Sequence, residues 1–248
     1  MQLSFLTWAE ARDAIEKSPL VVVPIGSTEQ HGPNGLIGTD ALNAEAVAIA
    51  VGKAAGALVS PVIAIGMAQH HLAFSGSITL RPSTMIAFVA DYVFSLARHG
   101  VRKFFFINGH GGNVAPLSAA FSEIYAAASL DPTGQVPRLR CVQHNWYDQN
   151  GVRALGQSFY GERDGSHATA SEVALTQHLF PDSIRRVNMP PVGKAHRRFT
   201  DAIDLRTLHP DGRIGSEPSL ATPEQGRQLF EAAVAELMAL LGQFRDEA

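Results

Sequence analysis

A short polar segment near the N-terminus reads Gly26-Ser27-Thr28-Glu29-Gln30-His31-Gly32-Pro33 and continues to Gly38-Thr39-Asp40. Glu29 and His31 are two residues apart, so on an extended segment their side chains point to the same side. Asp40 follows a turn rich in glycine and proline that can fold the chain back. Two carboxylates and an imidazole can therefore converge on one point, and this ligand set suits a divalent metal.

A second polar segment lies far away in the sequence. The apolar run 20–25, just before the first segment, predicts a buried strand, and so does the run 103–107. The sequence Asn108-Gly109-His110-Gly111-Gly112-Asn113 follows the latter at once, which places His110 at the carboxyl end of a strand. Ligands gather at such strand ends in open α/β sheets. If the two strands are neighbours, their loops bring His110 to the three side chains described above.

The composition limits the classes of function. The chain has 248 residues, of which 46% are hydrophobic, and a formal net charge of −3. This charge gives no reason to expect nucleic acid or an anionic membrane as a partner. The single cysteine, Cys141, excludes an internal disulfide and suits a reducing compartment. Residues 1–10 lack the features of a signal peptide, and no apolar run reaches the length of about 20 residues that a spanning helix needs. We expect a cytoplasmic protein.

Strand and helix patterns alternate along the whole chain without a linker-like break. Further strands are expected at 57–66 and 138–146, whereas 147–166 and 181–221 read as loops. Helices are expected near 8–17, 42–51, 83–99, 115–128, 169–179 and from 222 onward. We expect one α/β domain over 1–248, with helices on both faces of a largely parallel sheet. Neither a dinucleotide-binding fingerprint nor a phosphate-binding loop is present in the sequence.

These motifs resemble those of the creatininase family of metal-dependent amidohydrolases. The resemblance includes His167-Ala168, followed by Glu172, and the segment 215–222 before the last helix. Order and spacing agree over nearly the whole chain. The resemblance implies a three-layer α/β/α sandwich, assembly as a homohexamer, and a centre of two divalent ions (Zn, Mn or Fe) that hydrolyses C–N bonds.

The resemblance also implies roles for individual residues. Glu29 and His110 would hold one metal, His31 would hold the other, and Asp40 would bridge both. Each has a plainer alternative, because Asp40 could merely cap a helix and the others could be ordinary loop residues. Four such residues in two matching motifs favour the metal role.

The late motif adds two candidates. His167 is expected to transfer protons or contact substrate, and Glu172 to ligate metal or to act as an acid or base. Five residues separate them, so they do not share one helix face; His167 should precede the helix and Glu172 should lie in its first turn. For Glu172, a carboxylate that only stabilises the helix N-terminus is the alternative.

Further candidates for substrate contact are His70, His71, Gly111 and Trp146. For the two histidines, solvated loop positions are an equal alternative, and for Trp146 the alternative is packing in the core.

The sequence departs from true creatinine hydrolases after His110. Gly111 and Gly112 stand where those enzymes are expected to carry a bulky aromatic and an acidic residue, which points away from creatinine and removes one potential ligand of the second metal. Thr169 likewise replaces a glycine of the late motif. The Asn-Gly-His-Gly-Gly-Asn form resembles the branch of deformylases, peptide-cleaving maturases and hydrolases of other cyclic compounds.

The leading hypothesis is hydrolysis of a small cyclic amide by a metal-activated water. A deformylase or a hydrolase of small peptides with the same site is the second hypothesis. A catalytically silent metal-binding oligomer is the third, and the intact ligand set argues against it.

Overall fold

A parallel sheet of four strands, in the order β2-β1-β3-β4, forms the centre of the molecule. The structure is a computed structural model that describes residues 1–193, 195 and 198–247. Its strands are β1 (Leu20–Ile25), β2 (Leu58–Val59), β3 (Lys103–Asn108) and β4 (Arg140–Asn145).

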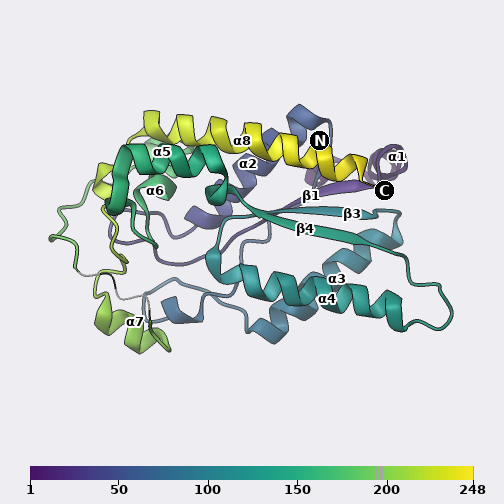
Figure 1. Cartoon of the computed structure of the whole chain (residues 1–248), viewed down its shortest axis with the longest axis horizontal. Helices are drawn as coiled ribbons and strands as arrows, with labels where there is room; N and C mark the ends of the chain where they lie inside the picture. The colour runs from purple at the N-terminus through teal and green to yellow at the C-terminus, as the bar shows by residue number, and fades with distance from the viewer. Residues whose placement is uncertain (194, 196–197, 248) are drawn as a thin grey trace.

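Helices cover both faces of this sheet (Figure 1). One face carries α3 (Pro82–Arg98) and α4 (Val114–Leu130), and the other carries α2 (Thr39–Ala55), α5 (Asn150–Tyr160), α6 (Ala170–Leu179) and α8 (Pro223–Asp246). Two further helices, α1 (Trp8–Lys17) and α7 (Ala202–Leu208), lie outside these layers. The expected three-layer α/β/α class is confirmed.

The central strands are apolar on both sides because both faces are covered. In β3, Phe104 and Phe106 belong to the core on the α3 and α4 side, whereas Phe105 and Ile107 belong to the core under α2 and α8. All four side chains are fully buried. This strand therefore needs a continuous run of apolar residues and not an alternation of apolar and polar residues.

The strand order creates a crevice between β1 and β3. From β1 the chain passes through α2 to β2 on one side, and from β3 it passes through α4 to β4 on the other. The ends of the strands are in register, since Ile25 pairs with Asn108 and Asn108 with Asn145. Loops that leave such strand ends in opposite directions leave room for a ligand between them.

Three expectations were wrong. The strand expected at 57–66 ends at Val59 apart from one bridge between Ile25 and Ile63, because Pro61 lacks the N–H that would continue the ladder. The presumed loop 147–166 contains α5, which buries Val152 and Tyr160 toward α8. The presumed loop 181–221 contains α7.

No helix within the described residues combines the length and the apolar character needed to cross a bilayer.

Close packing of α6 on α8 generates a prediction for stability. A Cβ atom on Gly226 of α8 would lie 1.9 Å from the carbonyl oxygen of Ala174 in α6, whereas one on Gly242 of the same helix would meet nothing within 4 Å. Gly226→Ala should therefore lower the free energy of unfolding by about 1–3 kcal/mol. Gly242→Ala, the matched control, should raise it by up to about 1 kcal/mol through helix propensity. Urea unfolding measures both, and equal stabilities of the two variants would contradict this packing.

Candidate metal centre

Asp40 lies in the first turn of α2, between the loops that follow β1 and β3. A Cβ atom on Gly26 would lie 2.4 Å from the backbone nitrogen of Ala41, and one on Gly109 would lie 2.3 Å from the carbonyl oxygen of Asp40. Only glycine permits so close an approach of backbone to backbone. The two glycines thus allow the start of α2 to enter the crevice at the carboxyl ends of the strands.

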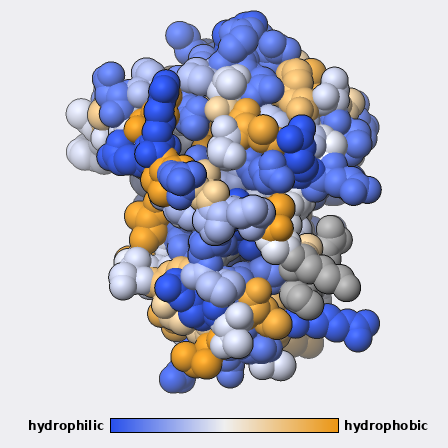
Figure 2. Space-filling model, turned by 90° about the vertical axis from the view of Figure 1, so that its left-hand side faces the viewer, coloured by the Kyte–Doolittle hydropathy of each residue, from blue (hydrophilic) through white to orange (hydrophobic). Residues whose placement is uncertain are grey.

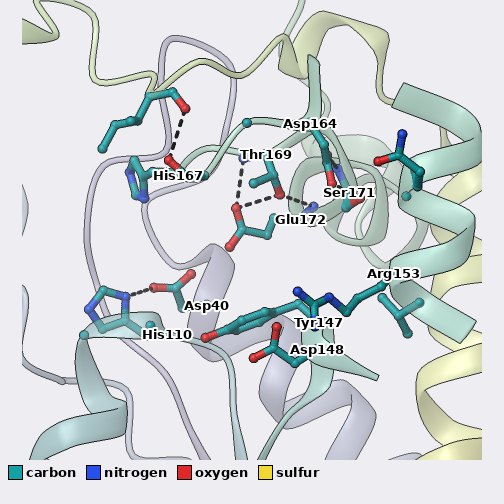
Figure 3. A pocket seen from close by; sticks show the side chains of 18 of the residues that line it. Asp40, His110, Tyr147, Asp148, Arg153, Asp164, His167, Thr169, Ser171 and Glu172 are labelled. Carbon is teal, nitrogen blue, oxygen red and sulfur yellow. Dashed lines mark hydrogen bonds and ion pairs between the residues drawn. The ribbon is translucent and has the colours of Figure 1, made fainter. Parts of the chain in front are cut away.

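Four buried side chains meet at this point. The distance from His31 Nε2 to Asp40 Oδ1 is 2.9 Å. The distance from His110 Nδ1 to Asp40 Oδ2 is 3.1 Å (Figure 3). On its other side, His110 Nε2 lies 3.2 Å from Glu29 Oε2. The two polar segments singled out in the sequence therefore form one cluster.

Ligand atoms within 4.8 Å of one another form three groups in the described residues: Glu29, Asp40 and His110; His31, Asp40 and Glu172; and Glu29, His31 and His167. The first two groups share Asp40. Their donors are carboxylate oxygens and imidazole nitrogens without a thiolate, which is a set that Zn, Mn and Fe accept.

Unsatisfied atoms in the cluster indicate that a cation fits. Both carboxylate oxygens of Glu29, the Nε2 atom of His31 and the Oδ2 atom of Asp40 are buried without a hydrogen bond of regular geometry. Such atoms are costly to leave unpartnered in a protein interior. A divalent cation among them would supply the missing partner, so the residues present support divalent metal binding.

The ionisable groups of the cluster affect one another's charge. Burial disfavours the charged form of His31, but Asp40, Glu172 and Glu29 together outweigh burial and raise the pKa of His31 to about 10. Burial likewise opposes ionisation of Asp40, yet His31 and His110 lower its pKa. The carboxylates thus favour positive charge at the positions where metal ions would contribute it.

Glu172 is oriented by the start of α6. Its Oε2 atom accepts hydrogen bonds from the backbone nitrogen and from Oγ1 of Thr169, both at 2.9 Å, in a capping box. Burial raises the pKa of Glu172 to about 7. As the sequence predicts, His167 precedes the helix and Glu172 lies in its first turn. Capping occupies one carboxylate oxygen, so the other can serve the His31 and Asp40 group.

Gln30 holds two further histidines against Glu29. Its backbone carbonyl lies 2.8 Å from His167 Nε2, and its amide nitrogen lies 3.0 Å from His71 Nδ1. The opposite ring nitrogens face Glu29 Oε1, at 3.7 Å for His167 Nδ1 and at 3.3 Å for His71 Nε2. Burial lowers the pKa of both rings and so favours their neutral forms.

Two asparagines stabilise the turn at His110, and we predicted no role for either from the sequence. Asn108 Oδ1 accepts the N–H of His110, and Asn108 Nδ2 donates to the carbonyl of the same residue. Asn113 donates to the carbonyl of Gly26 and accepts the N–H of Met67. Their positions at the two ends of the glycine-rich segment were the feature of the sequence that could have indicated this role. Their hydrogen bonds connect the loops that contain Gly26, Met67 and His110, and so help to position His110.

A cavity of about 590 Å³ opens above the cluster. Figure 2 views the molecule at the end that carries α5, α6 and α7, where hydrophilic residues predominate at the surface. The predicted residues Asp40, His70, His71, His110, Gly111, His167 and Glu172 line the cavity. The rings of His70 and Phe199 pack in a tilted arrangement, with 5.2 Å between their centroids, and burial lowers the pKa of His70 to about 4. The two glycines after His110 leave this part of the wall without side chains.

Trp146 does not line the cavity, so the expectation of substrate contact is wrong in position. Its side chain is fully buried in the core under α8, as the packing alternative predicts. The next residue, Tyr147, lines the cavity instead and extends toward the cluster (Figure 3). Burial raises the pKa of Tyr147, so its hydroxyl keeps the proton. The sequence showed two adjacent aromatic residues but not which one faces inward.

Comparisons with known proteins agree with this geometry. The family model of creatininase, described as creatinine amidohydrolase, matches residues 4–241. A mycofactocin precursor peptide peptidase of Mycolicibacterium smegmatis is 39% identical over 227 residues, which are 87% of this chain and 81% of the relative. A creatinine amidohydrolase of Pseudomonas putida is 28% identical over 246 residues, which are 92% of this chain and 91% of the relative.

Solved structures share the fold. A creatininase variant complexed with creatine gives a TM-score of 0.83 at 25% identity, with 98% of this chain and 97% of that chain covered. A crystal structure of creatinine amidohydrolase (creatininase) gives a TM-score of 0.82 at 24% identity, with 100% of this chain and 98% of that chain covered. The match of the family model over nearly the whole length carries the assignment. This chain belongs to the creatininase family, whose members are hydrolases that act on amide C–N bonds.

Proposed function

We propose that this chain hydrolyses an amide bond of a small peptide-like substrate with the help of two divalent cations. The carrying observation is the pair of ligand groups that share Asp40 at the floor of the cavity. Glu29 and His110 would complete one site, and His31 and Glu172 the other. Glu172 would thereby supply the ligand that the sequence lacks at Gly112.

Several chain residues prepare the reaction. Bound divalent cations supply Lewis acidity, which polarises a carbonyl and lowers the pKa of water. His31 is held in one orientation, because its Nδ1 atom lies 3.1 Å from the carbonyl oxygen of Glu29 and can donate to it. His167 can donate through Nε2 to the backbone carbonyl of Gln30, which leaves Nδ1 unprotonated. Nδ1 can then take a proton from the attacking water and pass it to the leaving nitrogen. The Tyr147 hydroxyl is a donor for the substrate oxygen.

Room in the cavity supports a peptide-like substrate over a very small one. A volume of about 590 Å³ is within the range of about 300–1,000 Å³ for pockets that hold drug-sized ligands. Gly111 and Gly112 keep the wall beside His110 open. The relative from Mycolicibacterium smegmatis is a peptidase by name, which agrees with this choice.

A small cyclic amide is the second candidate substrate. The likeness to a creatinine amidohydrolase over 92% of the chain favours it. A deformylase would use the same centre, so formamides belong in the test. An intact ligand set argues against a catalytically silent metal-binding oligomer.

We further propose a single domain over residues 1–248, a homohexamer and a cytoplasmic location. Exposed aromatic residues near the N-terminus, Phe5 and Trp8, each 79% exposed, support contacts between subunits. The net charge of −3 supports the absence of nucleic acid or an anionic membrane surface as a partner.

Metal binding should stabilise the fold. Zn²⁺ or Mn²⁺ at about 100 times its dissociation constant should raise the free energy of unfolding by about 2.7 kcal/mol. For a chain of this size, this corresponds to a rise in Tm of roughly 5–10 °C. Asp40→Asn should lose this rise, since both ligand groups include Asp40. Glu123→Gln, an exposed change on α4, should retain it. Differential scanning fluorimetry with and without a chelator measures the shift. A full rise in Asp40→Asn would place the metal elsewhere.

The number of metal ions bound per chain should depend on which ligands are present, because Asp40 belongs to both proposed sites and Glu172 to one. Mass spectrometry of the dialysed protein should find about two ions per chain in the wild type and about one in Glu172→Gln. Asp40→Asn should hold close to none. Equal metal content in all three proteins would refute the proposed division of ligands.

Hydrolysis rates for a panel of amide compounds can identify the substrate class. We expect the metal-loaded protein to hydrolyse short peptides faster than lactams, cyclic ureas or formamides. Asp40→Asn should lower the rate at least 100-fold, and Glu123→Gln should match the wild type. Liquid chromatography of the products measures each rate. Preference for a cyclic amide would favour the second candidate, and no turnover with metal bound would favour the silent oligomer.

A further inference from the structure

The cavity wall opposite the ligand cluster carries one arginine, Arg153. It lies in the first half of α5, and its exposed side chain extends into the part of the cavity where Tyr147 and Asp148 lie (Figure 3). Among the described residues that line the cavity, Arg153 is the sole lysine or arginine. A fixed positive charge therefore occurs once on this wall.

Arg153 has no partner within the described part of the chain, in contrast to the acidic residues near it. Its guanidinium makes no hydrogen bond or ion pair there. Asp148 accepts a hydrogen bond of 2.7 Å from Asn145 Nδ2. Asp164 accepts two from Ser171, at 2.9 Å from the backbone nitrogen and at 2.8 Å from Oγ. The two carboxylates thus have structural partners, while the cation remains available to a ligand.

The surroundings of Arg153 leave space for such a ligand. Gly156 and Gly161, both in the lining, contribute no side chains, and the cavity is continuous from α5 to the ligand cluster. A substrate with its amide at the cluster can therefore extend another group to Arg153. A guanidinium offers paired N–H donors that match the two oxygens of a carboxylate.

We propose that Arg153 binds a carboxylate of the substrate, away from the amide bond that is cleaved. The inference rests on the proposed function and narrows it to amides that also carry a carboxylate, such as short peptides with a free C-terminus. Arg153 then determines specificity without taking part in the bond cleavage.

Matched substrates test the proposal on the metal-loaded protein. Short peptides of increasing length are prepared with a C-terminal carboxylate or with a neutral carboxamide. For at least one length, the wild type should prefer the carboxylate by about 10- to 100-fold in kcat/KM, the range of a charge-assisted hydrogen bond. Arg153→Gln should reduce this ratio to about one, mainly through KM, and Arg153→Lys should recover part of it. Arg98→Gln, an exposed change at the end of α3, is the matched control and should leave the ratio unchanged.

Different failures have different meanings. Hydrolysis of both forms at equal rates by the wild type, or an unchanged ratio in Arg153→Gln, would overturn the role of Arg153 while amide hydrolysis stands. If neither form is cleaved, the proposed function fails. Calorimetric titration with the same peptides then still decides about Arg153. Tighter binding of the carboxylate form by the wild type but not by Arg153→Gln supports the proposal, and equal binding by both overturns it.

Discussion

The start of α2 contacts the loops after β1 and β3, and the geometry of the site depends on this contact. Gly26 and Gly109 let two backbones approach the peptide that joins Asp40 to Ala41. A carboxylate at this position faces His31 from one loop and His110 from the other. The two ligand groups share Asp40 because the helix enters between the strands and not beside them.

Burying this many ionisable groups is costly for the fold. Carboxylates and imidazoles in a protein interior require opposite charge and hydrogen bonds to offset the loss of water. Gln30 contacts the rings of His71 and His167. Asn108 and Asn113 bond to backbone groups and join the loops to one another. Several ligand atoms nevertheless stay unsatisfied. That pattern is characteristic of a site which trades stability for function.

The outer part of the cavity is built differently from its floor. The floor comes from strand ends and the first turns of α2 and α6, which the sheet holds in place. The wall around Arg153 and Tyr147 comes from the 3-10 turn Trp146–Asp148 and from α5. Family members can therefore keep the reaction and change the substrate by altering this wall, as fixed chemistry on a rigid scaffold allows.

Apolar runs and short motifs depend on neighbours along the chain. They were therefore enough to predict the fold class, the strands at 20–25 and 103–107, and the residues of the cluster. They missed α5, since Gly151 and Gly156 obscured a helix whose stability comes from packing on α8. They also could not decide between Trp146 and Tyr147, nor show Arg153 without a partner. Which side chain faces a cavity is decided by contacts between segments far apart in sequence, and only the tertiary structure brings those segments together.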